Sequence, residues 1–130
     1  MRFILVVSLW FWAQVSVAQD ADIQSVITAQ IEAFEQGDFE AAFSHASPSI
    51  QNYFGGADRF EAMVRSGYEM VIMPRDVRFL EMRNLDGKLW QKVLIQDSDN
   101  VFHLLEYQMI SHDGQWRING VRFVQAGAAA

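Results

Sequence analysis

The spacing of apolar residues changes near the middle of this chain, and this change constrains the fold more than any other feature. In the first half, apolar side chains recur every three or four residues, as on one face of a helix. From Val77 onward they alternate, as in strands with one face toward a core. Helices followed by strands predict an α+β domain in which the helices pack on one face of a curved sheet.

Residues that start and stop helices divide the first half into four segments. Asp20 or Asp22 is expected to cap the first helix, whose inward stripe is Ile23, Val26, Ile27, Gln30, Ile31 and Phe34. Gly37 ends it, Asp38 caps a second helix, Pro48 opens a short third one and Asp58 caps a fourth that closes at Gly67. We therefore expect four N-terminal helices.

Turn residues divide the second half into four strands, at about 76–85, 88–96, 100–110 and 115–124. Asp86-Gly87 is a strong two-residue hairpin signal. Asp97–Asn100 and His112–Gly114 supply the other two turns. Because the connections are short, the strands are predicted to form an antiparallel meander.

The first eighteen residues have the pattern of a signal peptide. Arg2 is the only charge before Asp20, the run 3–13 is apolar apart from Ser8, and Ser16-Val17-Ala18 offers small residues for cleavage. A membrane anchor is the alternative, but it needs about 20 apolar residues. We predict an exported protein cleaved after Ala18, with no membrane contact afterwards.

Composition bounds the remaining chain, which we interpret as one domain over 19–125 followed by a flexible Ala/Gly tail over 126–130. Hydrophobic residues make up 51% of the sequence, which excludes a disordered chain. A formal charge of −6 argues against nucleic-acid partners. The sequence contains no cysteine, so disulfides, thiol catalysis and thiolate metal sites are excluded.

Both faces of the predicted sheet carry apolar side chains, whereas a half-solvated antiparallel sheet should alternate cleanly. If the face with Leu105 and Tyr107 is covered by the helices, the opposite face keeps an apolar set of five residues, Trp90, Leu94, Phe102, Leu104 and Ile110. This is more exposed apolar area than a monomer usually tolerates. We therefore predict a homodimer formed through this face.

Motifs of catalysis are absent from the sequence. There is no phosphate loop and no Gly-x-Ser-x-Gly elbow, and none of His45, His103 and His112 has a histidine four residues away. His103 and Glu106 are three residues apart in a strand, so they point to opposite faces and cannot form a local pair. We expect no metal and no cofactor.

Four residues are candidates for the lining of a pocket. His103 and Tyr107 share a strand face about 13 Å apart at roughly 3.3 Å per residue, close enough to line one cavity. Tyr53 and Tyr68 have amphipathic rings suited to a pocket mouth.

The stretch Trp116–Val121 is predicted to be structural. Trp116 and Ile118 share one strand face and are expected to pack on the first helix, with Arg117 and Asn119 on the other face. Gly120 then interrupts the alternation, as a bulge would.

A series of short motifs follows in order along the chain: Ala33-Phe34, Asp38-Phe39, Ala42-Phe43, Ala46-Ser47-Pro48, Ile50, Phe54-Gly55, Phe60, Met63-Val64, Gly67-Tyr68, Tyr107-Gln108-Met109 and Trp116-Arg117-Ile118-Asn119-Gly120-Val121. In this series the chain resembles the bacterial domain of unknown function family 4864. The order of helices and curved sheet also resembles the broader nuclear transport factor 2-like cone fold. The resemblance implies that fold and a periplasmic or secreted bacterial protein, and it supplies no activity.

Three functions remain open at this point. The first is a non-catalytic module that binds a small apolar or amphipathic ligand in the cone, favoured by the many aromatic and methionine residues. The second is a structural or protein-binding homodimer without ligand. The third is a cone-fold hydratase, isomerase or hydrolase that uses His103 or Glu106; it lacks the perturbing neighbour that a catalytic base needs.

Overall fold

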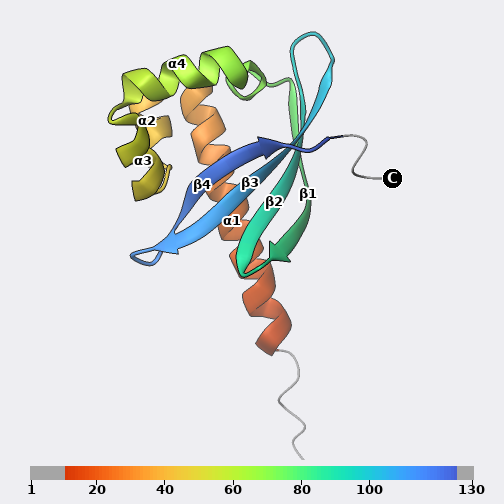
Figure 1. Ribbon diagram of the computed structural model, residues 1–130. Coiled ribbons are helices and arrows are strands. Elements are labelled where there is room, and N and C mark those ends of the chain that lie inside the picture. The colour runs from red at the N-terminus through yellow and green to blue at the C-terminus, as the bar shows by residue number, and fades with distance from the viewer. Residues whose placement is uncertain (1–10, 126–130) are drawn as a thin grey trace, which may run out of the picture.

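The computed structural model describes the backbone of residues 11–125 and the side chains from Ala18 to Gln125. The predicted tail and most of the predicted signal peptide therefore lie outside the described residues. Within this range the elements follow the predicted order (Figure 1): α1 (Phe11–Glu35), α2 (Phe39–Ser44), α3 (Pro48–Phe54), α4 (Ala57–Gly67), the 3₁₀ turn η1 (Glu69–Val71), β1 (Asp76–Leu85), β2 (Lys88–Gln96), β3 (Phe102–His112) and β4 (Gln115–Phe123). The α+β prediction is confirmed.

The short helices begin and end at residues whose chemistry favours those positions. The Asp38 carboxylate accepts a hydrogen bond from the Ala41 amide at 3.0 Å and caps α2. The Ser47 hydroxyl caps α3 in front of Pro48, and Gly55 ends this helix with a φ of 75°.

Two predicted caps are wrong. α1 begins at Phe11, because no glycine or proline separates that residue from Asp20 and Asp22, and the helix continues through both. Gly56, and not Asp58, occupies the N-cap of α4. Asp58 lies in the first turn, where its negative charge still favours the helix N-terminus. No helix in the described part of the chain is long and apolar enough to cross a membrane.

The sheet is the predicted antiparallel meander, with strand order β1-β2-β3-β4. At both Asp86-Gly87 and Asp113-Gly114 the two central residues have positive φ, as type I′ hairpin turns require. β3 begins and ends two residues later than predicted. At its start, the Asp97 carboxylate accepts hydrogen bonds from the Asp99 and Val101 amides and so extends the turn before Phe102.

One face of the sheet packs on α1, and the core lies between them (Figure 1). The core side chains where α1 meets the sheet include ten that are at most 4% exposed: on α1 they are Ile23, Ile27, Ile31 and Phe34, and on the sheet Val93, Ile95, Leu105, Tyr107, Met109 and Ile118. The helical stripe and the alternating strands thus bury their predicted faces against each other. Burial of such side chains stabilises the fold by about 1.5–3 kcal/mol each.

A junction between the second and third helices and the last strand fixes the tertiary arrangement. Ala46 forms a parallel bridge with Ile118, and the Ser47 amide donates to the Ile118 carbonyl at 2.8 Å. The Ser47 hydroxyl contacts Asn119 Oδ1 at 2.7 Å, and Asn119 Nδ2 donates to Gln108 Oε1 at 2.7 Å. The Ala-Ser-Pro and Trp-Arg-Ile-Asn-Gly-Val motifs, 72 residues apart, therefore meet in space.

The bulge predicted around Gly120 is confirmed. Ile118 pairs with Met109 and Gly120 pairs with Gln108, so Asn119 is the extra residue. Ile118 is buried as predicted, while Trp116 is half-buried at the edge of the core. Arg117 donates to the Ser44 carbonyl, in agreement with a backbone-binding role.

Candidate functional site

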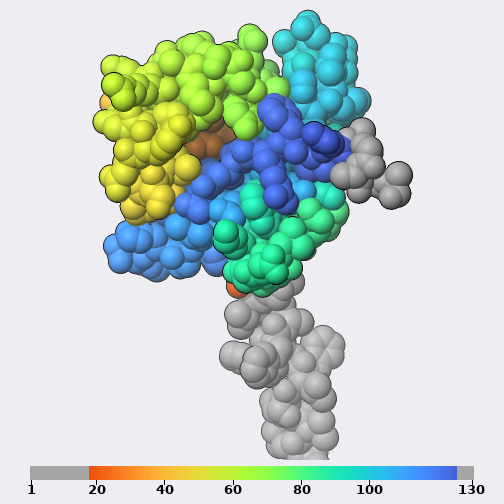
Figure 2. Space-filling model, viewed as in Figure 1, coloured from red at the N-terminus to blue at the C-terminus, as the bar shows by residue number. Residues whose placement is uncertain are grey.

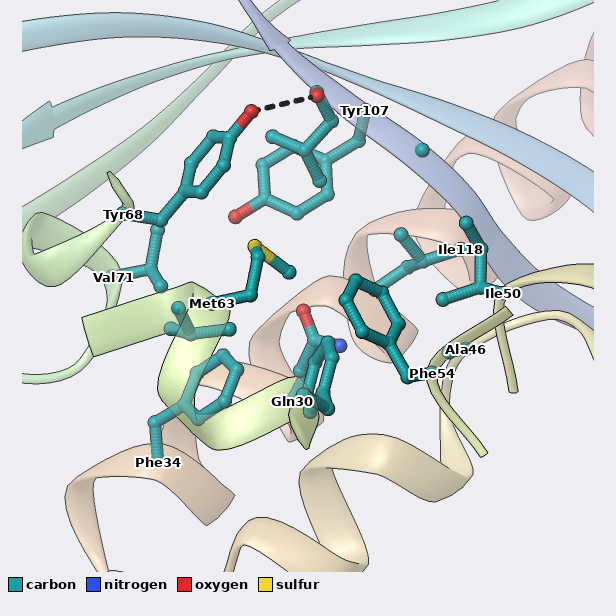
Figure 3. A pocket seen from close by; sticks show the side chains of 14 residues that line it. Gln30, Phe34, Ala46, Ile50, Phe54, Met63, Tyr68, Val71, Tyr107 and Ile118 are labelled. Atoms are coloured by element: carbon teal, nitrogen blue, oxygen red, sulfur yellow. Dashed lines mark hydrogen bonds between the residues drawn. The ribbon is translucent and has the colours of Figure 1, made fainter. Parts of the chain in front are cut away.

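A cavity of about 200 Å³ opens between the helices and the sheet. In Figure 2 its mouth is a hollow between α3 and α4, in yellow and green, and β4, in blue, with atoms of α1 at the floor. The residues around it come from these elements, from β3, from η1 and from the segment between α2 and α3 (Figure 3), and they are Gln30, Phe34, Ala46, Ile50, Phe54, Phe60, Met63, Val64, Tyr68, Val71, Tyr107, Ile118, Gly120 and Val121.

Helical spacing places the apolar wall of this cavity. Phe60, Met63 and Val64 follow the i, i+3, i+4 pattern on α4 and face inward together. Ile50 and Phe54, four residues apart, do the same on α3. The Phe60 ring lies 5.8 Å from that of Phe54 and 5.9 Å from that of Phe34, in the range of favourable aromatic pairs, so the wall is packed and pre-formed.

Three polar side chains line the cavity. Two of them donate hydrogen bonds to backbone carbonyls, and the third does not. The Tyr68 hydroxyl donates to the Val121 carbonyl at 3.1 Å (Figure 3). Gln30 Nε2 donates to the Ala42 carbonyl at 3.2 Å. The Tyr107 hydroxyl makes no hydrogen bond to a described residue; since no fully enclosed polar side-chain atom of the described residues lacks a partner, this oxygen is accessible from the cavity.

The cavity is electrically neutral. Of the described residues that line it, none carries a charge at pH 7. Burial, with a smaller contribution from Tyr68, raises the pKa of Tyr107 far above its usual range, so its hydroxyl keeps its proton. The arrangement can thus bind an apolar molecule and offer it hydrogen bonds, without an acid or base that titrates near neutral pH.

The four predicted pocket residues separate into two groups. Tyr68 and Tyr107 line the cavity. Tyr53 does not, because Ile50 and Phe54 take the inward face of α3 and leave Tyr53 on the other side, 79% exposed. His103 lies in another surface depression, beside Asp97 and Glu69, near the start of the strand whose middle residue is Tyr107.

His103 lies near the start of β3 and contacts the turn before this strand. Its Nε2 lies 2.8 Å from Asp97 Oδ2, and this contact, followed by the hydrogen bond from the Val101 amide, lowers the pKa of Asp97. Since the same carboxylate also holds two backbone amides, the pair stabilises the turn. Its imidazole is not directed at the apolar cavity.

Glu106 lies on the outer face of the sheet, and its side chain is 3% exposed. Arg83 Nη2 donates to both carboxylate oxygens, at 2.7 and 2.9 Å, and Arg122 approaches at 3.5 Å. The hydrogen bond to Glu106 raises the pKa of Arg83. Arg122 in turn stacks over the Trp90 ring at 3.8 Å. Neither His103 nor Glu106 lines the cavity, so the enzymatic alternative has no acid–base group there.

Sequence reasoning did not assign Gln30 to the site. Its signal was present, because Gln30 is the one polar member of the apolar stripe on α1. A polar side chain at such a position must find a partner when buried. Of the residues that the structure describes, no group of three or more could hold a metal ion.

Comparison with known families identifies the chain's relatives. Residues 16–130 match the family described as Domain of unknown function (DUF4864). This match covers most of the chain, which therefore belongs to that family. No curated protein matches the sequence.

Proposed function

We propose that this member of the DUF4864 family is a non-catalytic module that binds a small, mainly apolar molecule in the cavity between α1, α3, α4 and β4. The observation that carries the proposal is an open, pre-formed cavity of about 200 Å³ whose wall is almost entirely apolar. Apolar cavities that water fills poorly are favourable sites for such ligands.

The cavity volume limits the size of the ligand. An apolar cavity of about 150 Å³ is enough to hold benzene, and sites for drug-sized molecules begin near about 300 Å³. A volume of about 200 Å³ therefore suits roughly six to ten non-hydrogen atoms inside the wall. A longer molecule would extend through the mouth into solvent.

Filling the cavity tests this proposal. Val121 lines the cavity, whereas Val101 lies outside it and is 52% exposed. We expect Val121→Phe to abolish benzene binding measured by ligand-observed NMR, and Val101→Phe, the matched control, to leave it unchanged. Equal benzene binding by both variants, or none by the wild-type protein, would contradict the proposal.

We also propose that the protein is exported to the periplasm or secreted. The described core begins at Ile23, so cleavage after Ala18 would remove none of the described core side chains. Intact-mass measurement of the exported protein should give Gln19, or its cyclised form, as the N-terminus. A soluble pool that retains residues 1–18 would overturn this. The helix order and the sheet packed around α1 further support placement in the nuclear transport factor 2-like cone group.

A homodimer through the outer sheet face is a second proposal, favoured by Phe102, which is 58% exposed there. Trp90, Leu94, Leu104 and Ile110 on the same face are half-buried. Sedimentation at micromolar concentration should give the dimer mass for the wild-type protein and the monomer mass for Phe102→Asp. A monomer in both cases excludes the dimer.

A further inference from the structure

We propose that the ligand of the cavity is an uncharged molecule whose apolar body carries one hydroxyl group, bound by the Tyr107 hydroxyl and the Gln30 amide oxygen. This inference rests on the proposed binding function and names its ligand class. It starts from the two polar atoms of the wall that the fold leaves without a partner.

The Tyr107 hydroxyl is the first of these atoms. Its side chain is buried on β3, and in Figure 3 its oxygen points into the space that the lining side chains enclose. No described residue hydrogen-bonds to this oxygen, and since no fully enclosed polar side-chain atom of the described residues lacks a partner, the oxygen is accessible from the cavity. A molecule that fills the cavity and excludes water must therefore supply its hydrogen-bond partner. Because burial raises the pKa of Tyr107, the hydroxyl offers a proton as well as lone pairs.

The Gln30 amide oxygen is the second atom. Only the NH₂ end of the side chain can donate, so the hydrogen bond to the Ala42 carbonyl at 3.2 Å fixes which end faces α2. The oxygen is left on the cavity side, and Figure 3 shows it directed inward. No described residue donates to it. The wall thus presents one acceptor from α1 and one donor from β3.

These two atoms select the chemistry of the ligand. A ligand hydroxyl can donate to the Gln30 oxygen and accept from the Tyr107 hydroxyl, so its chemistry matches both atoms. A carboxylate would face the Gln30 oxygen without any cation in the described wall, and an ammonium would lack an anion. A pure hydrocarbon would leave both protein groups unsatisfied, which costs free energy.

Phenol and toluene form the matched pair of probes, because they differ only by a hydroxyl against a methyl group of similar size. Hydrophobic transfer alone favours toluene. We expect the wild-type protein to bind phenol about fivefold or more tightly than toluene, because two net hydrogen bonds of about 1 kcal/mol each exceed the roughly 0.8 kcal/mol that burial of the toluene methyl group contributes. Titration followed by NMR or calorimetry measures both dissociation constants.

Variants assign the preference to the two atoms. Tyr107→Phe should bring the two probes to similar affinities while toluene binding stays within about twofold. Gln30→Met, of similar length, should also reduce the preference. Tyr53→Phe on the exposed face of α3 is the matched control and should change neither constant.

The outcomes separate the two proposals. Toluene bound as tightly as phenol by the wild-type protein would overturn the hydroxyl inference and leave the apolar binding function standing. Failure of both probes to bind would overturn the binding function and this inference with it. The wild-type comparison alone decides these cases, so it does not depend on the folding of any variant.

Discussion

Glu106 and Tyr107 are neighbours on β3, and their polar groups lie on opposite faces of the sheet. The polar group on the outer face has protein partners, and the one on the inner face faces a cavity. On the outer face, the Glu106 carboxylate has Arg83 on both oxygens and Arg122 beside it. On the inner face, the Tyr107 hydroxyl lies in an apolar cavity without a described partner. Both side chains are almost fully buried, so burial alone does not separate a structural polar group from one available to a ligand.

The two groups differ in whether other protein groups supply their hydrogen-bond partners. A buried charge is tolerated when its lone pairs are filled by protein donors, and the Glu106 cluster fills them across three strands. A buried hydroxyl with its proton unused keeps that capacity for another molecule. We therefore interpret the Glu106 cluster as structural and the cavity on the inner face as a candidate ligand-binding site.

The largest expected effect compares two adjacent leucines on β3. Leu105 is fully buried on the inner face, and Leu104 is half-buried on the outer face. Leu105→Ala should lower the free energy of unfolding by about 2–5 kcal/mol, the range for a core cavity. Leu104→Ala should cost clearly less in the same urea titration. Equal losses would mean that the outer face is covered, as in the proposed dimer.

The Glu106 cluster gives the next effect. Glu106→Gln keeps the shape and removes the charge, so it should lower the free energy of unfolding by about 1–3 kcal/mol, the range for hydrogen bonds to charged groups. Glu81→Gln is the control, because its contact with Lys92 is solvent-exposed, and it should change little. A Glu106→Gln protein as stable as the wild type would show that the cluster does not stabilise the sheet.

Acid should lower the stability of the fold without lowering the affinity of the cavity for benzene. Burial, and next the Arg117 guanidinium, lower the pKa of His45, so the unfolded chain binds this proton more readily. The His45 contribution is complete above about pH 6.5 and is lost as pH falls from there through the folded pKa. His45→Gln should therefore reduce the drop in Tm between pH 7.5 and 5.5.

Benzene affinity should stay constant over the same range, since no described wall residue titrates there. A ligand affinity that follows the Tm instead would mean that the cavity itself loosens in acid.

The smallest expected change in the free energy of unfolding tests the contrast between Glu106 and Tyr107 most directly. Tyr107→Phe removes a hydroxyl that has no described partner, so the free energy of unfolding should change by less than about 0.5 kcal/mol. Thermal and urea unfolding measure it. A loss of 1 kcal/mol or more would show that the hydroxyl is satisfied within the protein, and the inner face would then resemble the outer one.

Much of the fold could be predicted from local patterns. The stripe from Ile23 to Phe34, the caps at Asp38 and Ser47-Pro48, and the Asp86-Gly87 hairpin depend on spacing and turn chemistry that short segments carry by themselves. The misplaced caps at Asp20, Asp22 and Asp58 follow from the same source. A side chain that can cap a helix does not start one where the residues before it are already helical, as they are before Asp20 and Asp22.

Of the four residues predicted to line a pocket, two line the cavity, because the sequence pattern does not show which way each side chain faces in the folded chain. Tyr68 and Tyr107 could be chosen as amphipathic rings, but the same argument selected Tyr53, which faces solvent. The choice among equal side chains depends on the rotation of α3, which Ile50 and Phe54 set by packing. His103 shares the strand face of Tyr107, yet it lies four residues earlier, near the start of β3 and beside Asp97.

The sequence by itself determined the class of this protein: four helices, then a four-stranded meander, with one face of each element apolar, because periodicity and turn residues act over a few positions. Only the tertiary structure decided which polar groups meet. Ser47 and Asn119 are 72 residues apart, and Arg83, Glu106 and Arg122 come from three strands. No local pattern encodes such pairs, so the paired Glu106 carboxylate and the cavity-facing Tyr107 hydroxyl became distinguishable only once the chain was folded.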